Sequence, residues 1–182
     1  MKIQIPDYIQ VLIDLLNQNG YSAYVVGGAI RNALLELPIH DYDLTTDATP
    51  QEMLQVFSNY RVFQTGIQHG TITVLSNKQP VEITTFRSES IYEDHRHPSG
   101  VLFSKSIEED CKRRDFTINA LCYNNNEGLI DFFGGVDDLH HKIIRCIGNP
   151  HERIDEDALR ILRALRFAGR LSFTIEENTA TA

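Results

Sequence analysis

Gly27-Gly28-Ala29-Ile30-Arg31, followed closely by Asp41-Tyr42-Asp43, is the most informative stretch of this chain. Residues 24–26 form a short apolar run typical of a buried strand, and residues 29–37 carry apolar side chains at helical spacing. The glycine pair therefore lies at a predicted strand-to-helix turn, where unpaired N–H groups and the positive end of the helix dipole favour an anion. Gly27 and Gly28 let a phosphate approach the backbone, and Arg31 adds a fork of donors.

Asp41 and Asp43 are separated by a single residue, so a strand directs both carboxylates to the same face. Magnesium binds one or two protein carboxylates together with phosphate oxygens, and two ions about 3.5–4 Å apart clamp the attacking and leaving oxygens of a transfer reaction. Taken alone, the glycines also fit an ordinary turn, and the acids fit a solvated strand end. Together they predict a nucleotidyl-transfer site in which Asp41 and Asp43 bind two Mg²⁺ ions.

A third acidic candidate, Glu82, lies in the alternating stretch 81–87. Alternation places Val81 and Ile83 on one face of a strand and Glu82 on the other, beside Phe86. Glu82 is either a catalytic acid that supports the metal pair or an exposed strand residue. The pattern leaves both readings open.

The composition is that of a globular protein: 182 residues, 42% hydrophobic, with a formal net charge of −8. This length fits one domain, or one domain plus part of another. The sequence contains no apolar run of membrane-spanning length and no signal peptide pattern at its start, so we expect a cytoplasmic location and no membrane partner. Cys111, Cys122 and Cys146 are odd in number and widely spaced, which indicates reduced, partly buried thiols.

Periodicity predicts an α/β fold, with a mixed sheet flanked by helices in a head of residues 1–148. Helices are expected at 6–19, 29–37, 50–57 and 131–139, and strands at 24–26, 41–45, 61–64, 71–75, 81–86 and 143–147. Residues 88–106 are polar and contain Pro98 and Gly100, so a loop beside the site is expected there. After Gly148-Asn149-Pro150, residues 149–182 are expected to begin an all-α neck, with a helix over 156–171.

Further motifs resemble those of the class II tRNA nucleotidyltransferase and bacterial poly(A) polymerase family, in the DNA polymerase beta superfamily. Besides the glycine and aspartate pairs, they comprise Arg113-Arg114-Asp115-Phe116-Thr117-Ile118-Asn119-Ala120, Asp131-Phe132-Phe133-Gly134-Gly135, Glu156-Asp157-x-x-Arg160 and Arg163-Ala164-Leu165-Arg166-Phe167. Two departures accompany the match. Asn32 stands where the family commonly has an aspartate, and residues 1–182 are expected to comprise the head and the start of the neck without the family's helical body and tail domains.

The resemblance implies a head that transfers nucleotides from ATP and CTP. It assigns contacts with the triphosphate and ribose to Arg113, Arg114, Asp115 and Asn119. By the same resemblance, Arg163 and Arg166 continue the nucleotide-binding face. The alternatives are a basic loop with a capping aspartate and arginines that merely cover the core.

Glu156, Asp157 and Arg160 suggest a protein-based reading of the nucleobase. A carboxylate accepts from the exocyclic amine of cytosine or adenine, and an arginine three residues later donates to the adjacent ring acceptor. Uracil and guanine present an acceptor at the amine position, so the carboxylate repels them. The alternative is a helix start stabilised by a Glu156–Arg160 pair.

The sequence thus predicts a template-independent enzyme that adds C, A or both to the 3′ end of tRNA and releases pyrophosphate. A bacterial poly(A) polymerase, a small-molecule adenylyltransferase and a catalytically silent nucleotide- or RNA-binding module are the competing hypotheses. The intact Asp41 and Asp43 pair argues against a silent module. The sequence leaves the oligomeric state and the choice among CC, A and CCA open.

Overall fold

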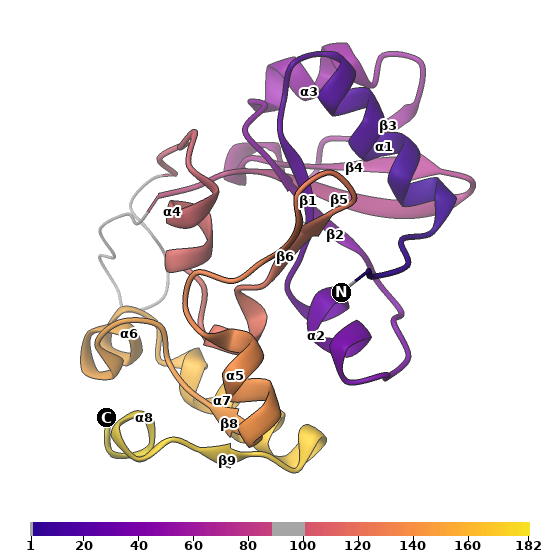
Figure 1. Cartoon of the computed structure of the whole chain (residues 1–182). Helices are drawn as coiled ribbons and strands as arrows, with labels where there is room; N and C mark the ends of the chain where they lie inside the picture. Colours follow the sequence, from indigo (N-terminus) through magenta and orange to yellow (C-terminus); the bar gives the residue numbers. More distant parts are fainter. Residues whose placement is uncertain (1, 89–100) are drawn as a thin grey trace.

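A computed structural model describes residues 2–88 and 101–182. Within them a seven-stranded mixed sheet has the order β3-β4-β5-β2-β1-β6-β7, in which β2 and β5 run parallel and the other pairs antiparallel (Figure 1). The strands are β1 (Ala23–Val26), β2 (Asp43–Thr46), β3 (Arg61–Phe63), β4 (Thr71–Ser76), β5 (Gln79–Thr85), β6 (Cys122–Asn124) and β7 (Gly128–Ile130). The predicted α/β class is confirmed.

Helices cover this sheet and extend from it. They are α1 (Asp7–Gln18), α2 (Gly28–Leu34), α3 (Pro50–Val56), α4 (Ile107–Lys112), α5 (Gly135–His141), α6 (Pro150–Glu156), α7 (Leu159–Leu171) and α8 (Glu177–Thr181), with 3₁₀ turns η1 (Ile67–His69) and η2 (Thr117–Asn119). A second, two-stranded sheet pairs β8 (Ile143–Ile144) with β9 (Thr174–Ile175). None of the helices in this described part of the chain has both the length and the hydrophobicity needed to span a lipid bilayer.

One face of the large sheet packs against helices, and the other carries the site. Helix α1 buries Ile9, Leu12, Ile13 and Leu16 against one face, as its spacing predicts, and α3 packs beside it, begun by a capping box between Thr49 and Glu52. The opposite face carries Asp43, whose strand register places it across from Val26 on β1 and Glu82 on β5. The site is therefore built on the face that α1 and α3 leave uncovered.

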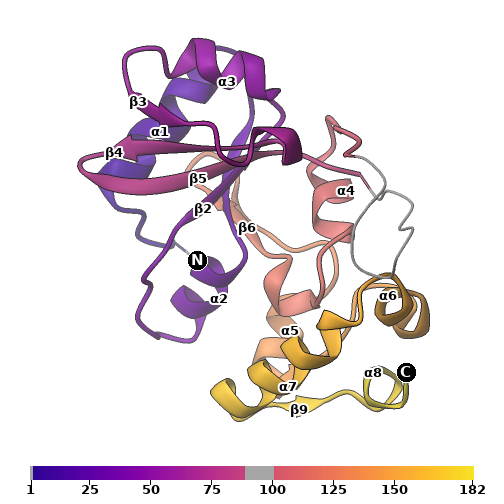
Figure 2. The same cartoon turned by 180° about the vertical axis from the view of Figure 1, so that it is seen from behind.

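The segment after the sheet gathers at the end of the molecule away from α1 and α3 (Figure 2). Here the predicted strand over 143–147 is wrong in extent, because β8 covers only Ile143–Ile144 and pairs in parallel with β9. Arg145 turns its side chain to Asp138 and Glu176, while Cys146 forms an isolated bridge with Phe116. The domain boundary near residue 148 stays a prediction.

The predicted helix over 156–171 is confirmed from residue 159 onward but is wrong at its start, because the chain breaks at Asp157. Helix α6 ends at Glu156, Asp157 adopts an extended conformation (φ −148°, ψ 97°), and α7 begins at Leu159. The Asp157 carboxylate accepts from the Leu159 N–H at 3.0 Å, so it satisfies the first backbone donor of α7. Helical spacing on both sides of a break resembles one longer helix when read from sequence.

Besides the two 3₁₀ turns, the elements that were not predicted are α4, α6, α8, β9 and the hairpin of β6 and β7, and β9 shows that the segment after residue 148 is not all-α. The hairpin strands have three residues each, and the side chain of Asn124 closes the turn by accepting from Asn126 N and Glu127 N. Most of the expected loop at 88–106 lies outside the described residues, although Ser88 N donates to Leu102 O and Ser104 N donates to Phe86 O at its two ends. Cys111, Cys122 and Cys146 are free thiols, as predicted, and all are buried.

Candidate active site

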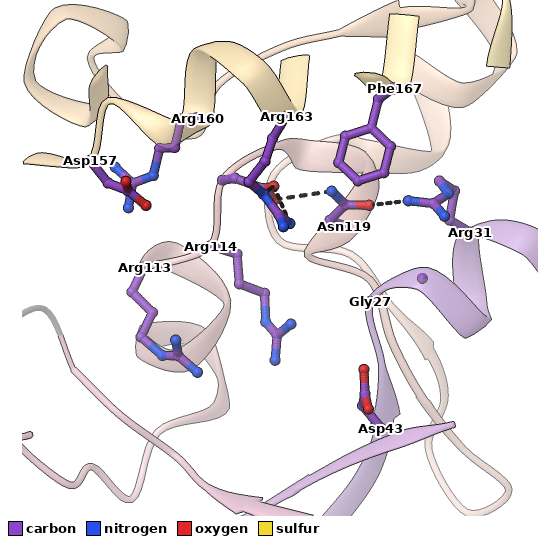
Figure 3. Close-up of a pocket in the computed structure, with 12 residues that line it drawn as sticks. Gly27, Arg31, Asp43, Arg113, Arg114, Asn119, Asp157, Arg160, Arg163 and Phe167 are labelled. Carbon is purple, nitrogen blue, oxygen red and sulfur yellow. Dashed lines mark hydrogen bonds and ion pairs between the residues drawn. The ribbon is translucent and has the colours of Figure 1, made fainter. Parts of the chain in front are cut away.

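One cavity of about 410 Å³ brings most of the predicted site residues together (Figure 3). Its walls come from the β1–α2 turn, the start of β2, the segment after α4, and α7. The lining residues are Gly27, Gly28, Arg31, Asp43, Arg113, Arg114, Asp115, Asn119, Asp157, Arg160, Arg163 and Phe167. Of the predicted residues, Asp41, Glu82, Glu156 and Arg166 do not line it.

The glycine turn lets the chain pass close to the basic side of the cavity. Gly27 has φ +72° and ψ −127°, a conformation that strains any residue with a side chain. A Cβ at this position would lie 3.4 Å from Nη1 of Arg114 and 3.6 Å from the Asn119 carbonyl oxygen. Gly27 N–H donates to Leu121 O at 3.1 Å, which holds the turn against the segment before β6.

The acidic side of the cavity is Asp43, the first residue of β2. Although its side chain is accessible, burial among protein atoms raises the pKa of Asp43; the Glu82 and Asp41 carboxylates raise it further, and Arg114 lowers it. Glu82 is its register partner on β5, while Asp41 is exposed and precedes the strand. Repulsion among carboxylates of this kind is relieved by a divalent cation.

No group of three or more His, Cys, Asp or Glu side chains in residues 2–88 and 101–182 is arranged to hold a metal ion by protein atoms alone. Magnesium commonly takes only one or two protein carboxylates and completes its shell with substrate phosphates and water. Asp43 fits such a donor set because it is a carboxylate at the cavity wall with further carboxylates nearby.

Arg113 and Arg114 form the basic wall next to Asp43. Both bind one buried carboxylate, Asp110, with Nη2 distances of 2.7 Å for Arg113 and 3.1 Å for Arg114. Burial lowers the pKa of Arg114, but Asp110 and the thiols of Cys122 and Cys111 outweigh it, so the pKa is raised and the charge is retained. The Arg114 Nε atom is buried and has no hydrogen-bond partner among the described residues.

A chain of polar contacts links the neck helix α7 to α2. Arg163 binds Asp115 through Nε at 2.7 Å and Nη2 at 2.6 Å, and Asn119 Nδ2 donates to the other Asp115 oxygen at 3.0 Å. Arg31 Nη1 in turn donates to Asn119 Oδ1 at 2.6 Å, as Figure 3 shows. Burial lowers the pKa of Arg31, and Arg170 lowers it further. Asn32, the departure from the family pattern, accepts from Arg31 Nη2 at 2.9 Å.

Phe167 lines the cavity, although the sequence analysis gave it no role beyond its place in the last motif. The guanidinium carbon of Arg31 lies 4.9 Å from the centre of its ring, and that of Arg163 lies 5.5 Å from it. Two cation–π contacts thus hold two cavity arginines on one aromatic side chain. Its position four residues after Arg163, on the arginine side of α7, is the signal that could have identified it.

The proposed base-reading residues flank the break between α6 and α7. Asp157 and Arg160 both line the cavity, and Arg160 is 5% exposed. Arg160 Nη1 donates to Glu156 Oε2 at 2.8 Å and to the carbonyl oxygen of Arg153. The Glu156–Arg160 pair that sequence offered as the alternative is therefore present, although it crosses the break between two helices. Arg166 is exposed outside the cavity.

Comparison with known proteins gives a consistent result. Residues 23–145 match the family described as "Poly A polymerase head domain". The CCA-adding enzyme of Enterococcus faecalis is 53% identical over 167 residues, which cover 92% of this chain and 41% of the relative. The CCA-adding enzyme of Streptococcus gordonii is 48% identical over 171 residues, which cover 94% of this chain and 42% of the relative.

Among solved structures, the CCA-adding enzyme of Bacillus stearothermophilus in complex with CTP superimposes with a TM-score of 0.86 and 39% identity, covering 97% of this chain and 42% of that one. A tRNA nucleotidyltransferase complexed with a primer tRNA and an incoming ATP analog superimposes with a TM-score of 0.75 and 34% sequence identity, and the match covers 93% of this chain and 48% of that one. The chain spans less than half the length of these proteins. The resemblance indicated by the motifs is confirmed.

Proposed function

Because the chain belongs to the poly A polymerase head domain family, we propose that it is the nucleotidyltransferase head of an enzyme that adds C and A residues from CTP and ATP to the 3′ end of tRNA. The observation that supports this function is a single cavity shared by Asp43, a wall of arginines, and the Asp157 and Arg160 pair. Metal binding, triphosphate binding and base selection thus meet in one place.

In the proposed reaction the 3′-hydroxyl of the RNA attacks the α-phosphorus of the triphosphate, and pyrophosphate leaves. Asp43 and Asp41 would hold two Mg²⁺ ions, and Glu82 would support Asp43 from the neighbouring strand. Magnesium bound there would lower the pKa of the attacking RNA hydroxyl and neutralise charge on the leaving pyrophosphate.

The arginine wall binds the triphosphate and ribose in this proposal. A phosphate oxygen would give the buried Arg114 Nε the partner that it lacks among the described residues. Arg113 lies beside Arg114, and Arg31 lies on the opposite side of the cavity, next to the glycine turn. Asp115 and Asn119 hold Arg163 and Arg31 rather than standing as isolated ligands.

Base selection is assigned to Asp157 and Arg160. The carboxylate accepts from the amine of cytosine or adenine, and the guanidinium donates to the neighbouring ring atom. Glu156 supports this pair by fixing Arg160 Nη1, so its role is to orient the arginine. The proposed partner is RNA with an accessible 3′ end, and a cytoplasmic location stays a prediction.

A poly(A) polymerase is the second candidate, because the matched family carries that description. The deciding experiment incubates the chain and Mg²⁺ with a tRNA lacking its 3′ CCA, giving labelled CTP alone, labelled ATP alone, or labelled ATP after unlabelled CTP, and measures CTP and ATP binding in parallel. Addition from CTP and then ATP supports the proposal, whereas extension with ATP alone identifies a poly(A) polymerase. Absence of both CTP and ATP binding contradicts the nucleotide site itself.

A further inference from the structure

Asp110 is a buried carboxylate to which the motifs assign no role. It is the last of three consecutive acids in α4, after Glu108 and Glu109, which are both exposed. The side chain of Asp110 has 0% exposure. Burying a carboxylate is costly unless it is paired and hydrogen-bonded, so its partners account for its position.

Both oxygens of Asp110 are fully engaged. Oδ1 accepts from Arg113 Nε at 2.9 Å and Nη2 at 2.7 Å, and from the Arg87 backbone N–H at 3.1 Å. Oδ2 accepts from Arg114 Nη2 at 3.1 Å and from Thr45 Oγ1 at 3.2 Å, and the same hydroxyl also lies 3.2 Å from the Thr84 carbonyl oxygen. One carboxylate therefore joins the two arginines that follow α4 to strand β2 and to the end of β5.

These partners connect the two chemical halves of the cavity. Arg113 and Arg114 line its basic wall, whereas Thr45 lies two residues after Asp43 on the same strand and the same face. Although burial raises the pKa of Asp110, Arg114 and Arg113 outweigh this effect and the pKa is lowered, so the group is an anion at neutral pH. Its negative charge also offsets the repulsion between the two guanidinium groups.

We propose that Asp110 is the positioning residue for triphosphate binding. It orients Arg113 and Arg114 toward the phosphates and fixes their position relative to β2, the strand that carries Asp43. This inference rests on the proposed function of the cavity. Asp110 acts through the arginines and has no contact with the nucleotide.

Two physical roles for Asp110 give opposite signs when its charge is removed. If the carboxylate only offsets positive charge, Asp110→Asn makes the wall more positive and binds CTP more tightly. If it positions the arginines, the amide loses strong charge-assisted bonds, the guanidinium groups leave their places, and CTP binds more weakly. The sign of the change therefore distinguishes the roles.

The experiment measures equilibrium binding of CTP and CMP to the chain in the presence of Mg²⁺, together with the melting temperature. Asp110→Asn is expected to weaken CTP binding about 10- to 100-fold, the range for a hydrogen bond to a charged group, and CMP binding less than about 2-fold. Glu108→Gln, the matched exposed acid of the same helix, is expected to leave both unchanged. Unchanged or tighter CTP binding by folded Asp110→Asn overturns the proposal.

A double-mutant cycle separates positioning from general support of the fold. In an Arg114→Ala background, Asp110→Asn should cost much less CTP affinity than in the wild type, because its partner is already absent. Equal losses in both backgrounds overturn the proposal.

Thr45→Val provides the test if Asp110→Asn does not fold, because it deletes one bond to Oδ2 and nearly preserves the shape of the side chain. A several-fold loss of CTP binding supports positioning, and no loss contradicts it. A wild-type chain that does not bind CTP overturns the proposed function as well, whereas normal wild-type binding with an unaffected cycle overturns only the role of Asp110.

Discussion

The acidic and basic walls of the cavity are positioned by different kinds of interaction. Asp43 is held by backbone pairing, because β2 lies between β1 and β5 and the register sets it beside Val26 and Glu82. The arginines are held by side-chain carboxylates, most of them three or four residues away in the sequence and one, Asp115, 48 residues away from Arg163. These pairs are Arg113 and Arg114 with Asp110, Arg163 with Asp115, and Arg160 with Glu156.

This difference predicts how each wall responds to substitution. A change at Asp43 alters a side chain on an intact sheet, so its effect should be confined to the metal. A change at Asp115 releases Arg163 and, through Asn119, reaches from α7 to Arg31. The acidic wall is therefore held by strand pairing, and the basic wall by side-chain contacts, of which those of Arg163, Asp115, Asn119 and Arg31 form a network.

The largest expected effect is at the acidic wall. Asp43→Asn should lower nucleotide transfer on the order of 10³-fold, because a metal ligand that stabilises the transition state is lost. Asp41→Asn should abolish transfer as well if both carboxylates bind metal. Circular dichroism should show a native fold in both variants, and Asp14→Asn on α1 is the exposed control. Full transfer by both site variants would disprove the metal assignment.

The second prediction concerns base selection by the neck. Asp157→Ala and Arg160→Ala should each relax selection for C and A over U and G by about 10- to 100-fold, because a good bidentate contact to a base edge contributes about 1–3 kcal/mol of discrimination. The measurement is the ratio of transfer efficiencies for the four triphosphates in each variant. Unchanged ratios at a lower overall rate mean that the two residues only support the break between α6 and α7.

The third prediction tests the connection through Asp115. Asp115→Asn removes the charged partner of Arg163, and we expect CTP to bind about tenfold more weakly; the effect is moderate because the Arg163 side chain is 51% exposed. Combined with Arg163→Ala, the losses should be less than additive. Independent, additive losses contradict the network.

A pH titration sharpens the contrast at the acidic wall. Because the pKa of Asp43 is raised by burial and then by Glu82, protons should compete with Mg²⁺ at a higher pH than for an ordinary aspartate. Mg²⁺-dependent CTP binding should therefore weaken as the pH falls through this pKa. Glu82→Gln should move the midpoint to lower pH, and an unmoved midpoint means that Glu82 does not act on Asp43.

The same shift has a consequence for folding stability. The pKa of Asp43 is higher in the folded chain than in the unfolded chain, so the folded state binds the proton more tightly. Its contribution to stability is present at low pH and is lost as the pH rises through the folded pKa. Asp43→Asn should remove this loss of folding stability at higher pH, so the melting temperature of the variant should fall less than that of the wild type as the pH rises through the pKa.

The smallest expected effect separates the two faces of α7. Arg166→Ala should change CTP binding less than about twofold, because Arg166 is exposed outside the cavity and surface substitutions of this kind have small effects. Arg163→Ala on the same helix is the positive comparison. A loss for Arg166→Ala equal to that for Arg163→Ala would show that the nucleotide reaches the outer face of α7.

The sequence located the glycine turn and Asp43, because glycine chemistry and strand patterns are local properties, although Asp41 precedes β2 and does not line the cavity. It could not reveal Asp110 or Phe167 as part of the site, since their importance depends on partners such as Thr45 and Arg31 that lie far away in the chain. Arg113, Arg114 and Arg163, which the motifs singled out, nevertheless all line the cavity. The helix break at Asp157 was missed because this aspartate looks like any acid at a helix start.

The most direct test of this two-wall account measures binding of CTP and UTP, each with and without Mg²⁺, to the wild type, Asp43→Asn and Asp157→Ala. We predict that Asp43→Asn loses the strengthening by Mg²⁺ but keeps the preference for CTP over UTP, whereas Asp157→Ala loses the preference but keeps the effect of Mg²⁺. If each variant loses both properties, or neither property is present in the wild type, the account of separate metal-binding and base-reading walls in one nucleotide site is contradicted.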